Sequence, residues 1–223
     1  MRVILFGASG MIGSGAVHEC LTDARVTSVV AVVRVPLGQT HPKLREVVHA
    51  DFFDYAPLAT TFAQSDACFF CLGVSAVGLD EAAYTRLTYD LTLAAARAMA
   101  QVNPASTFCY VSGQGTDSSE RGSAMWARVK GRTENAIMAL PFKAAYMFRP
   151  GFIQPMQGVR SKTWWYQAIY STLAPISPLL TRWLPGVATT SVRMGRAMIT
   201  VAADGFPQRI ITTRDINALG EAR

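Results

Sequence analysis

The sequence lacks the features that mark several classes of protein. Charged residues make up only 16% of its 223 positions, and they are scattered rather than gathered into runs of one sign. A nucleic-acid-binding tail, which needs a block of like charges, is therefore not expected. No secretory signal is recognisable before the first apolar run, so we expect a cytoplasmic protein. Half of the residues are hydrophobic, which is typical of a folded globular chain.

Cysteine is also scarce, and the four thiols do not suggest a disulfide framework. Cys68 and Cys71 have the spacing of a redox or metal-binding pair, but they lie in an apolar run that predicts a buried strand. Positions three apart on a strand point to opposite faces and lie roughly 10 Å apart. A disulfide needs Cα atoms within about 7 Å of each other. We therefore expect inert buried thiols and no metal site.

What the sequence does contain is a regular alternation of Val-rich runs and longer segments with helical periodicity. This alternation predicts βαβ units and a doubly wound sheet. The uninterrupted apolar runs suit parallel strands that are covered on both faces. Strands are expected at 2–6, 27–33, 47–49, 66–72, 106–111, 144–148 and 209–212, and helices at 11–22, 81–102, 123–140 and 191–202.

A glycine-rich loop joins the first predicted strand to the first predicted helix, with Gly7, Gly10 and Gly13 in the pattern G-x-x-G-x-x-G. The first glycine permits a tight turn, the second lets the backbone approach a pyrophosphate, and the third lets the helix pack close to the sheet. Free N–H groups at the helix start would then bind the anion. This context favours a dinucleotide site over an ordinary glycine turn. Further contacts from the loop are expected at Ser9, Met11 and Ile12.

The end of the second predicted strand indicates which dinucleotide is bound. NAD sites place Asp or Glu there to hold the ribose hydroxyls, whereas NADP sites avoid that charge and often use Arg. The sequence reads Val-Val-Arg-Val-Pro from 32 to 36, without an acidic residue. We therefore predict NADP(H), with NAD less favoured, and assign Arg34 to the 2′-phosphate in preference to a solvated strand end. The formal charge of +6 also favours an anionic ligand.

Together these motifs resemble the short-chain dehydrogenase/reductase superfamily, and most closely its atypical, NmrA-like and epimerase-like branches. The resemblance implies one α/β domain over residues 1–223, a Rossmann-type doubly wound parallel sheet in which residues 151–223 add a small C-terminal helical lid. It runs from residue 1 to about residue 153. Its landmarks are the Gly7–Gly13 loop, Asp51-Phe52, Cys71-Leu72-Gly73, Tyr110-Val-Ser-Gly113, Lys130 and Arg149-Pro-Gly-Phe152.

The resemblance implies roles at both ends of the cofactor. Asp51 and Phe52 would contact the adenine, with the carboxylate accepting from its amino group; the alternative is that Asp51 only caps a turn. Lys130 would bind the nicotinamide ribose and place a positive charge near the reacting centre; the alternative is a solvated helix residue. The nicotinamide end would be lined by Leu72, Gly73, Pro150, Gly151, Phe152 and Ile153.

The sequence departs from the superfamily pattern at the chemical centre. These enzymes commonly place a Tyr four residues before the Lys, on the same helical face, and its phenol moves the proton that accompanies hydride transfer. Here that position is Trp126, whose indole N–H is a donor only. The companion serine is either Ser112 or is replaced by Gly113. The candidate catalytic residues are therefore Ser112, Lys130 and Trp126.

Two classes of function fit this pattern. The first is an NADP(H)-dependent oxidoreductase or epimerase-like enzyme for an unknown small molecule, with a proton from Ser112, Gln114, Tyr84 or a cofactor hydroxyl with water. The second is a non-catalytic regulator or scaffold that senses NADP(H). A serine hydrolase is disfavoured because the chain lacks G-x-S-x-G. We expect a monomer or homodimer that contacts neither nucleic acid nor a membrane.

Residues 163–181 form an uncharged stretch. Pro175 and Pro178 interrupt it, and a membrane-spanning helix needs about 20 mostly apolar residues. We therefore expect a substrate pocket or an oligomer surface here rather than membrane contact. The aromatic cluster 164–166 suits an apolar or flat ligand, although core packing explains it nearly as well.

Overall fold

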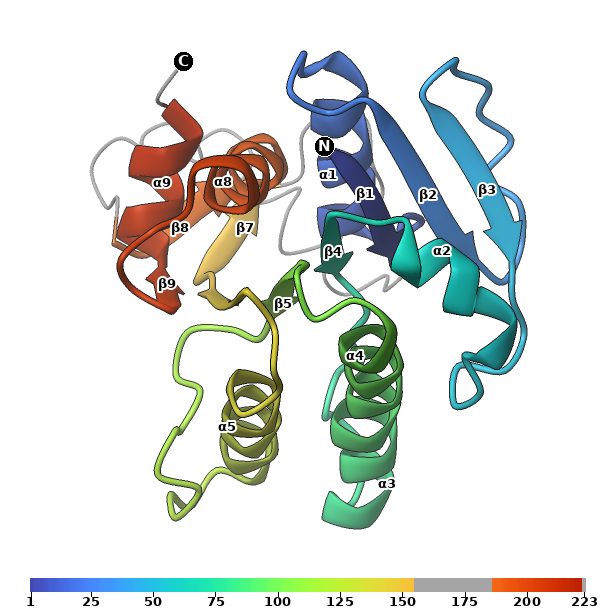
Figure 1. The fold of residues 1–223 in the computed structure, drawn as a ribbon. Coiled ribbons are helices and arrows are strands. Elements are labelled where there is room, and N and C mark those ends of the chain that lie inside the picture. Colours follow the sequence, from blue (N-terminus) through green and yellow to red (C-terminus); the bar gives the residue numbers. More distant parts are fainter. Residues whose placement is uncertain (155–185, 222–223) are drawn as a thin grey trace.

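Seven parallel strands form the central sheet of the computed structural model, which describes residues 1–154 and 186–221 (Figure 1). The strands lie in the order β3-β2-β1-β4-β5-β6-β9, and each neighbouring pair is parallel. This is the doubly wound Rossmann order, so the predicted fold class is confirmed. The strands are β1 (Arg2–Phe6), β2 (Ser28–Val33), β3 (Leu44–Val48), β4 (Ala67–Phe70), β5 (Thr107–Val111), β6 (Ala144–Arg149) and β9 (Ile210–Thr212).

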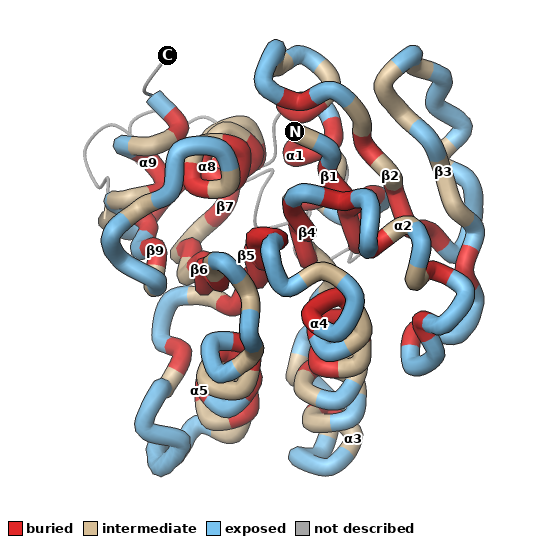
Figure 2. Tube along the Cα trace, in the orientation of Figure 1, coloured by how far each residue is buried: buried red, intermediate tan, exposed pale blue. Residues whose placement is uncertain are grey.

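Helices cover both faces of this sheet (Figure 1). The layer on one face consists of α1 (Met11–Thr22), α8 (Ser191–Asp204) and α9 (Thr213–Glu221). The layer on the other face contains α2 (Ala59–Ala63), α4 (Leu91–Val102) and α5 (Met125–Met138). Every residue of β4 and β5 is buried, as two-sided cover requires of a parallel sheet (Figure 2).

Smaller elements complete the described part of the chain. A 3-10 turn at Ala56–Leu58 precedes α2, and a separate pair of parallel strands joins β7 (Phe152–Gln154) to β8 (Ala188–Thr190). The helix predicted at 81–102 is divided into α3 (Glu81–Thr85), a π-helical segment (Arg86–Asp90) and α4. A π segment adds a residue per turn without ending the helix, so apolar spacing alone did not predict it.

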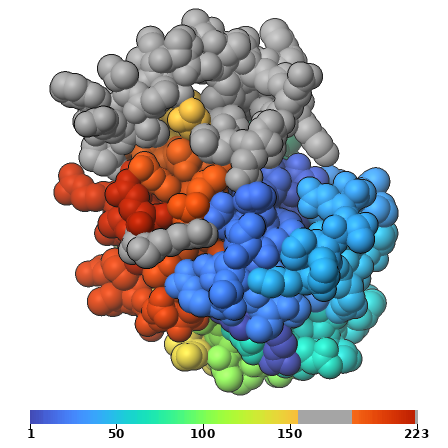
Figure 3. Space-filling model, turned by 90° about the horizontal axis from the view of Figure 1, so that it is seen from above, coloured from blue at the N-terminus to red at the C-terminus, as the bar shows by residue number. Residues whose placement is uncertain are grey.

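The two ends of the chain build one of these layers together. In Figure 3 the segment near the C-terminus lies directly against the N-terminal segment. Helices α1 and α8 cross so closely that a Cβ on Gly15 would come within 2.7 Å of the Ser191 Cβ, and one on Gly195 within 3.0 Å of the Ala16 Cα. The small residues at this crossing therefore hold α1 at a fixed distance from α8.

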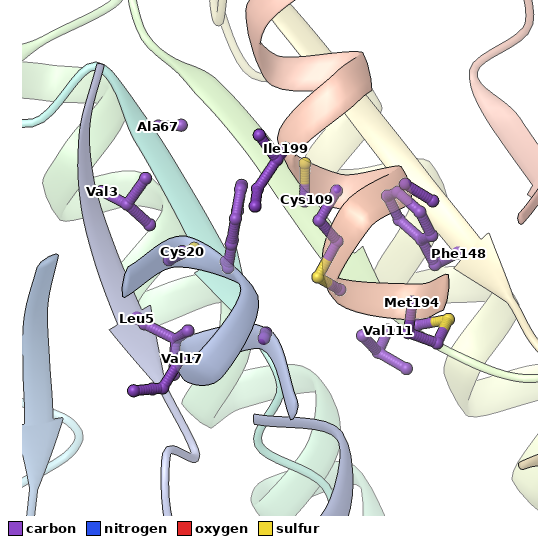
Figure 4. Close-up of a cluster of buried hydrophobic side chains, with 14 of the residues drawn as sticks. Val3, Leu5, Val17, Cys20, Ala67, Cys109, Val111, Phe148, Met194 and Ile199 are labelled. Atoms are coloured by element: carbon purple, nitrogen blue, oxygen red, sulfur yellow. The ribbon is translucent and has the colours of Figure 1, made fainter. Parts of the chain in front are cut away.

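Beneath this crossing lies a hydrophobic cluster that reaches the central strands. Figure 4 shows side chains of α1 and α8 converging on those of β1, β4, β5 and β6. Because α1 begins at the glycine loop, this packing also fixes the direction in which the helix start points. The labelled members are Val3, Leu5, Val17, Cys20, Ala67, Cys109, Val111, Phe148, Met194 and Ile199.

The cysteines behave as expected from the strand pattern. Cys68 belongs to the core on one face of the sheet and Cys71 packs against the core on the other. All four thiols are free, so the prediction that this pair forms no disulfide is confirmed. Burial raises the pKa of the Cys71 thiol to about 12, which keeps it protonated near neutral pH.

The C-terminal segment is helical, as predicted, and its described helices α8 and α9 pack on the sheet. Its role as a lid stays a prediction. The uncharged stretch 163–181, with its aromatic cluster 164–166, lies outside the described residues. Within residues 1–154 and 186–221, none of the helices combines the length and the apolar character needed to cross a bilayer.

The α1–α8 crossing generates a stability prediction. Gly15→Leu should lower the free energy of unfolding by about 1–3 kcal/mol, because the new side chain meets α8 where no space exists. Denaturant unfolding followed by circular dichroism measures this change. His18→Ala, at an exposed position of the same helix, is the control and should have little effect. Equal stabilities of Gly15→Leu and the wild type would contradict the packing described here.

Candidate dinucleotide site

The site forms where the chain order of the sheet reverses, between β1 and β4. Gly7 follows β1 and Cys71 follows β4. Gly7 has a positive φ of 80°, and a Cβ at this position would lie 2.7 Å from the carbonyl oxygen of Cys71. In open α/β sheets, ligands bind in the crevice beyond the carboxyl ends of the strands at such a reversal point.

The glycine loop provides an open approach to the start of α1. A Cβ on Gly13 would lie 2.1 Å from the carbonyl oxygen of Gly7, so the helix packs directly on the turn. Within residues 1–154 and 186–221, the one atom that a Cβ on Gly10 would meet is that same oxygen, at 3.2 Å. Gly10 caps α1 without a side-chain hydrogen bond, and the first turn contains no acidic residue. These features fit a pyrophosphate bound by backbone N–H groups.

One cleft opens beside the loop towards the end of β2. It has a volume of about 600 Å³, and Ser9 and Arg34 are both exposed at its wall. Among the described residues, Arg34 has no hydrogen-bond or ion-pair partner. The guanidinium is therefore available to an anion in this cleft.

The two residues predicted to contact the adenine differ in their exposure. Asp51 is exposed, and its Oδ1 accepts a hydrogen bond of 2.9 Å from the Phe53 N–H, so the turn-capping alternative is present. Phe52 is buried and packs edge-on against the rings of Phe6 and His49. Contact of either residue with adenine stays a prediction.

A second cleft of about 480 Å³ opens on the other side of the glycine loop. It unites segments that the sequence places far apart: the loop itself, the ends of β4 and β5, helix α5 and strand β7. Pro150 lies behind this wall, buried, and its carbonyl oxygen accepts from the Gln114 N–H at 2.8 Å. The predicted residues that line the cleft are Gly10, Met11, Ile12, Leu72, Gly73, Ser112, Lys130, Gly151, Phe152 and Ile153.

Lys130 contacts the backbone of Ser112 in this cleft rather than its hydroxyl. The Lys130 Nζ donates to the backbone carbonyl oxygen of Ser112. Burial lowers the pKa of the Lys130 ammonium to about 8, although the nearby Glu134 carboxylate favours the charged form. The hydroxyl of Ser112 is buried and directed towards Glu134 Oε1 and the Phe148 carbonyl oxygen.

Glu134 is the functional candidate that the sequence analysis missed. Its side chain is fully buried, and Arg149 Nε lies 3.0 Å from Oε1 while Arg149 Nη2 donates to Oε2. Arg149 also donates to Ser118 Oγ. Glu134 lies four residues after Lys130, on the same face of α5, so helical spacing could have drawn attention to it.

Two other predicted participants do not face this cleft. Trp126 lies in the first turn of α5, and its ring packs against the preceding loop, 3.2 Å from the position of a Cβ on Gly115. Tyr84 is only 1% exposed, and burial raises the pKa of its phenol. Tyr84 is not among the described residues that line this cleft, and its role as a proton donor stays a prediction.

A family model described as NAD(P)H-binding matches residues 7–141, which contain the glycine loop, Arg34 and Lys130. The chain belongs to this NAD(P)H-binding family. It is 27% identical to the protein HTATIP2 of Rattus norvegicus over 201 residues, which cover 88% of this chain and 79% of that protein. It is 28% identical to the mitochondrial protein FMP52 of Saccharomyces cerevisiae, over 73% of this chain and 69% of that protein.

Solved structures share the fold of this family member. The Bordetella bronchiseptica enzyme WbmF, in complex with NAD+, aligns with a TM-score of 0.65 at 16% identity, covering 97% of this chain and 76% of that one. A short chain dehydrogenase family protein from Francisella tularensis aligns with a TM-score of 0.64 at 12% identity, covering 92% and 91%. The predicted NAD(P)-binding family is confirmed by the family match, and the fold is similar to that of a short chain dehydrogenase family protein.

The loop geometry generates a binding prediction. Gly10→Val should abolish dinucleotide binding, because a branched side chain occupies the open side of the loop, while the free energy of unfolding changes little. Gly13→Val should instead destabilise the fold, since its Cβ has no space against Gly7. Isothermal titration with NADPH and thermal unfolding separate the two effects. Ala63→Val, at an exposed helix position, is the control for both measurements. Full binding by a folded Gly10→Val protein would show that the loop holds no pyrophosphate.

Proposed function

We propose that this protein is an NADP(H)-dependent oxidoreductase, or an epimerase-like enzyme, that acts on a small molecule. The observation that carries the proposal is the pair of clefts on either side of the glycine loop. One reaches the available guanidinium of Arg34, and the other reaches the ammonium of Lys130. A dinucleotide needs such an arrangement, because its pyrophosphate lies between two nucleoside halves.

The preference for NADP(H) rests on the charge around the first cleft. Arg34 stands directly after β2, where NAD-binding proteins of this fold usually place a carboxylate. The neighbouring strand β3 does carry Glu46, but its Oε2 accepts from the Leu37 N–H at 2.9 Å. That bond holds the loop after β2 in place and directs this carboxylate oxygen to the backbone. The described wall of the first cleft therefore carries the positive charge of Arg34 beside the neutral, polar Ser9, and this combination suits a 2′-phosphate.

The second cleft supplies the remaining parts of the proposed site. When bound there, a nicotinamide would exchange a hydride with the substrate. Gly73, Phe152 and Ile153 would orient its ring, and Lys130 would bind the adjoining ribose and face the reacting centre. Ser112 would help to position this group through its backbone carbonyl, since its hydroxyl is directed to Glu134.

A second candidate function is a non-catalytic sensor of NADP(H). It is supported by the surroundings of the two residues that the resemblance places at proton transfer. Trp126 stands at the phenol position and packs against Gly115, and the Ser112 hydroxyl is turned inward. In that case NADP(H) would bind without being oxidised or reduced, and the surface that the bound cofactor forms with the protein would be recognised by a partner protein.

We also propose a cytoplasmic monomer or homodimer. Free thiols persist in reducing compartments, and all four cysteines of this chain are free. The relative FMP52 is named as mitochondrial, so fractionation of cells that express the tagged protein is the direct test of location. Size-exclusion chromatography with light scattering tests the oligomeric state.

The proposed cofactor preference can be measured directly. NADPH should bind tighter than NADH, and Arg34→Ala should weaken NADPH binding about ten- to a hundredfold, as expected for the loss of roughly 1.5–3 kcal/mol from a charged hydrogen bond. NADH affinity should stay unchanged. Arg97→Ala removes the same charge from an exposed position on α4 and is the matched control. Equal affinities of the wild type for the two cofactors would refute the 2′-phosphate assignment.

The enzyme and the sensor differ in turnover. We expect slow NADPH oxidation with carbonyl compounds, reduced about 10²–10⁴-fold relative to enzymes of this fold that use a Tyr, because the phenol is missing. A panel of aldehydes and ketones, followed by NADPH absorbance, checks this rate. Saturable NADPH binding with no oxidation above the rate of a Gly10→Val control would support the sensor instead.

A further inference from the structure

The second cleft contains few groups that can move a proton. Its described lining includes two titratable side chains, Cys71 and Lys130. The Cys71 thiol is kept protonated by burial, as its raised pKa shows. The Ser112 hydroxyl donates to Glu134 Oε1, and the backbone carbonyl oxygen of Ser112 accepts from Lys130 Nζ. The ammonium of Lys130 is therefore the group best placed to exchange a proton there.

We propose that Lys130 Nζ gives the substrate oxygen the proton that accompanies reduction, and that Glu134 is the positioning residue that keeps this nitrogen charged. This inference rests on the proposed oxidoreductase function and deepens it. It names the reacting group of the substrate as a carbonyl oxygen, which is the atom that needs a proton once its carbon has been reduced.

The carboxylate of Glu134 is arranged to act through space on Lys130. Both residues lie on one face of α5, one helical turn apart. Glu134 is also held in place by Arg149 of β6 and by the Ser112 hydroxyl. A carboxylate held one helical turn away favours the charged form of the Lys130 ammonium.

The other groups around Lys130 make its proton exchangeable. Arg149 offsets part of the Glu134 charge, and Cys71, which lines the same cleft, is neutral because burial raises the pKa of its thiol. Burial of Lys130 itself then outweighs the attraction to Glu134, and its pKa falls to about 8. A group whose pKa lies near the working pH is both charged enough to be a donor and acidic enough to transfer its proton.

The step balances in atoms and electrons. The carbonyl carbon gains a hydride from the reduced nicotinamide, and the electron pair of the broken C=O π bond moves to the oxygen. That oxygen forms a bond to a proton as one N–H bond of Lys130 breaks, which gives an alcohol and a neutral amine. The amine regains a proton from water that enters the cleft.

The charge state of Lys130 can be followed without any cofactor. The chain contains four lysines, at 43, 130, 143 and 162, so labelling with [ε-13C]lysine gives an NMR spectrum in which each can be titrated. Lys130→Arg removes one signal and thereby identifies it. We expect this signal to titrate near pH 8, against roughly 10.4 for an ordinary lysine. A midpoint in the ordinary range would overturn the proposal.

Substitution of Glu134 tests the positioning role. Glu134→Gln removes an anion that favours the ammonium, so the midpoint of Lys130 should fall below its wild-type value, and the pH profile of NADPH oxidation should shift with it. Glu81→Gln, at an exposed position on α3, is the control and should leave the midpoint unchanged. An unchanged midpoint in folded Glu134→Gln contradicts the proposal. If this variant does not fold, the wild-type titration and Lys130→Arg decide.

The kinetic experiment separates this inference from the proposed function. In the wild type the rate of NADPH oxidation should fall as the pH rises through the NMR midpoint, because the donor loses its proton. Lys130→Arg keeps the charge but cannot release a proton in this range, so it should bind NADPH and lose at least about 10² in rate. Retained rate in Lys130→Arg refutes the inference alone. Wild-type protein that binds NADPH without turnover refutes the enzyme function and the inference together.

Discussion

The close approach of the β1–α1 turn to the end of β4 is the constraint on which the rest of the site depends. Gly7 and Gly13 leave no space for a side chain between the turn, the helix and the neighbouring strand. As a result the start of α1 projects into the gap where the strand order reverses, and one cleft forms on each side of it. The crossing of α1 with α8 then holds that helix from behind, so the C-terminal part of the chain supports the geometry of an N-terminal loop.

A second constraint operates beside the cleft that Lys130 lines. The Glu134–Arg149 pair joins α5 to β6, and Ser112 links it to the end of β5. Removal of one partner from a buried ion pair commonly costs about 3–5 kcal/mol, because the other charge stays uncompensated. The same pair determines where the Ser112 hydroxyl points and which charges Lys130 experiences. The stability of this region and the proposed proton transfer would therefore both depend on one carboxylate.

Local patterns predicted much of this from the sequence. The bounds of β1 and α1 agree with the expectation at 2–6 and 11–22, because an apolar strand, a glycine turn and a largely apolar helix follow one another without a gap. The elements that sequence reasoning missed depend on distant partners. Strand β7 exists because β8, more than 30 residues later, pairs with it. Helical spacing relates Glu134 to Lys130, but the pairing of Glu134 with Arg149 on β6 and with the Ser112 hydroxyl is a long-range contact that periodicity within α5 does not reveal. The residue roles assigned by resemblance stay predictions, and Asp51 shows why: its carboxylate already caps a turn.

A crystal structure of the protein with NADPH tests the central claim most directly, since the claim is that one dinucleotide occupies both clefts. The account predicts the pyrophosphate at the start of α1 beside Gly10, the 2′-phosphate in contact with the Arg34 guanidinium, and the nicotinamide beside Lys130. A dinucleotide bound with its pyrophosphate away from the glycine loop, or with its nicotinamide outside the cleft that Lys130 lines, would contradict it.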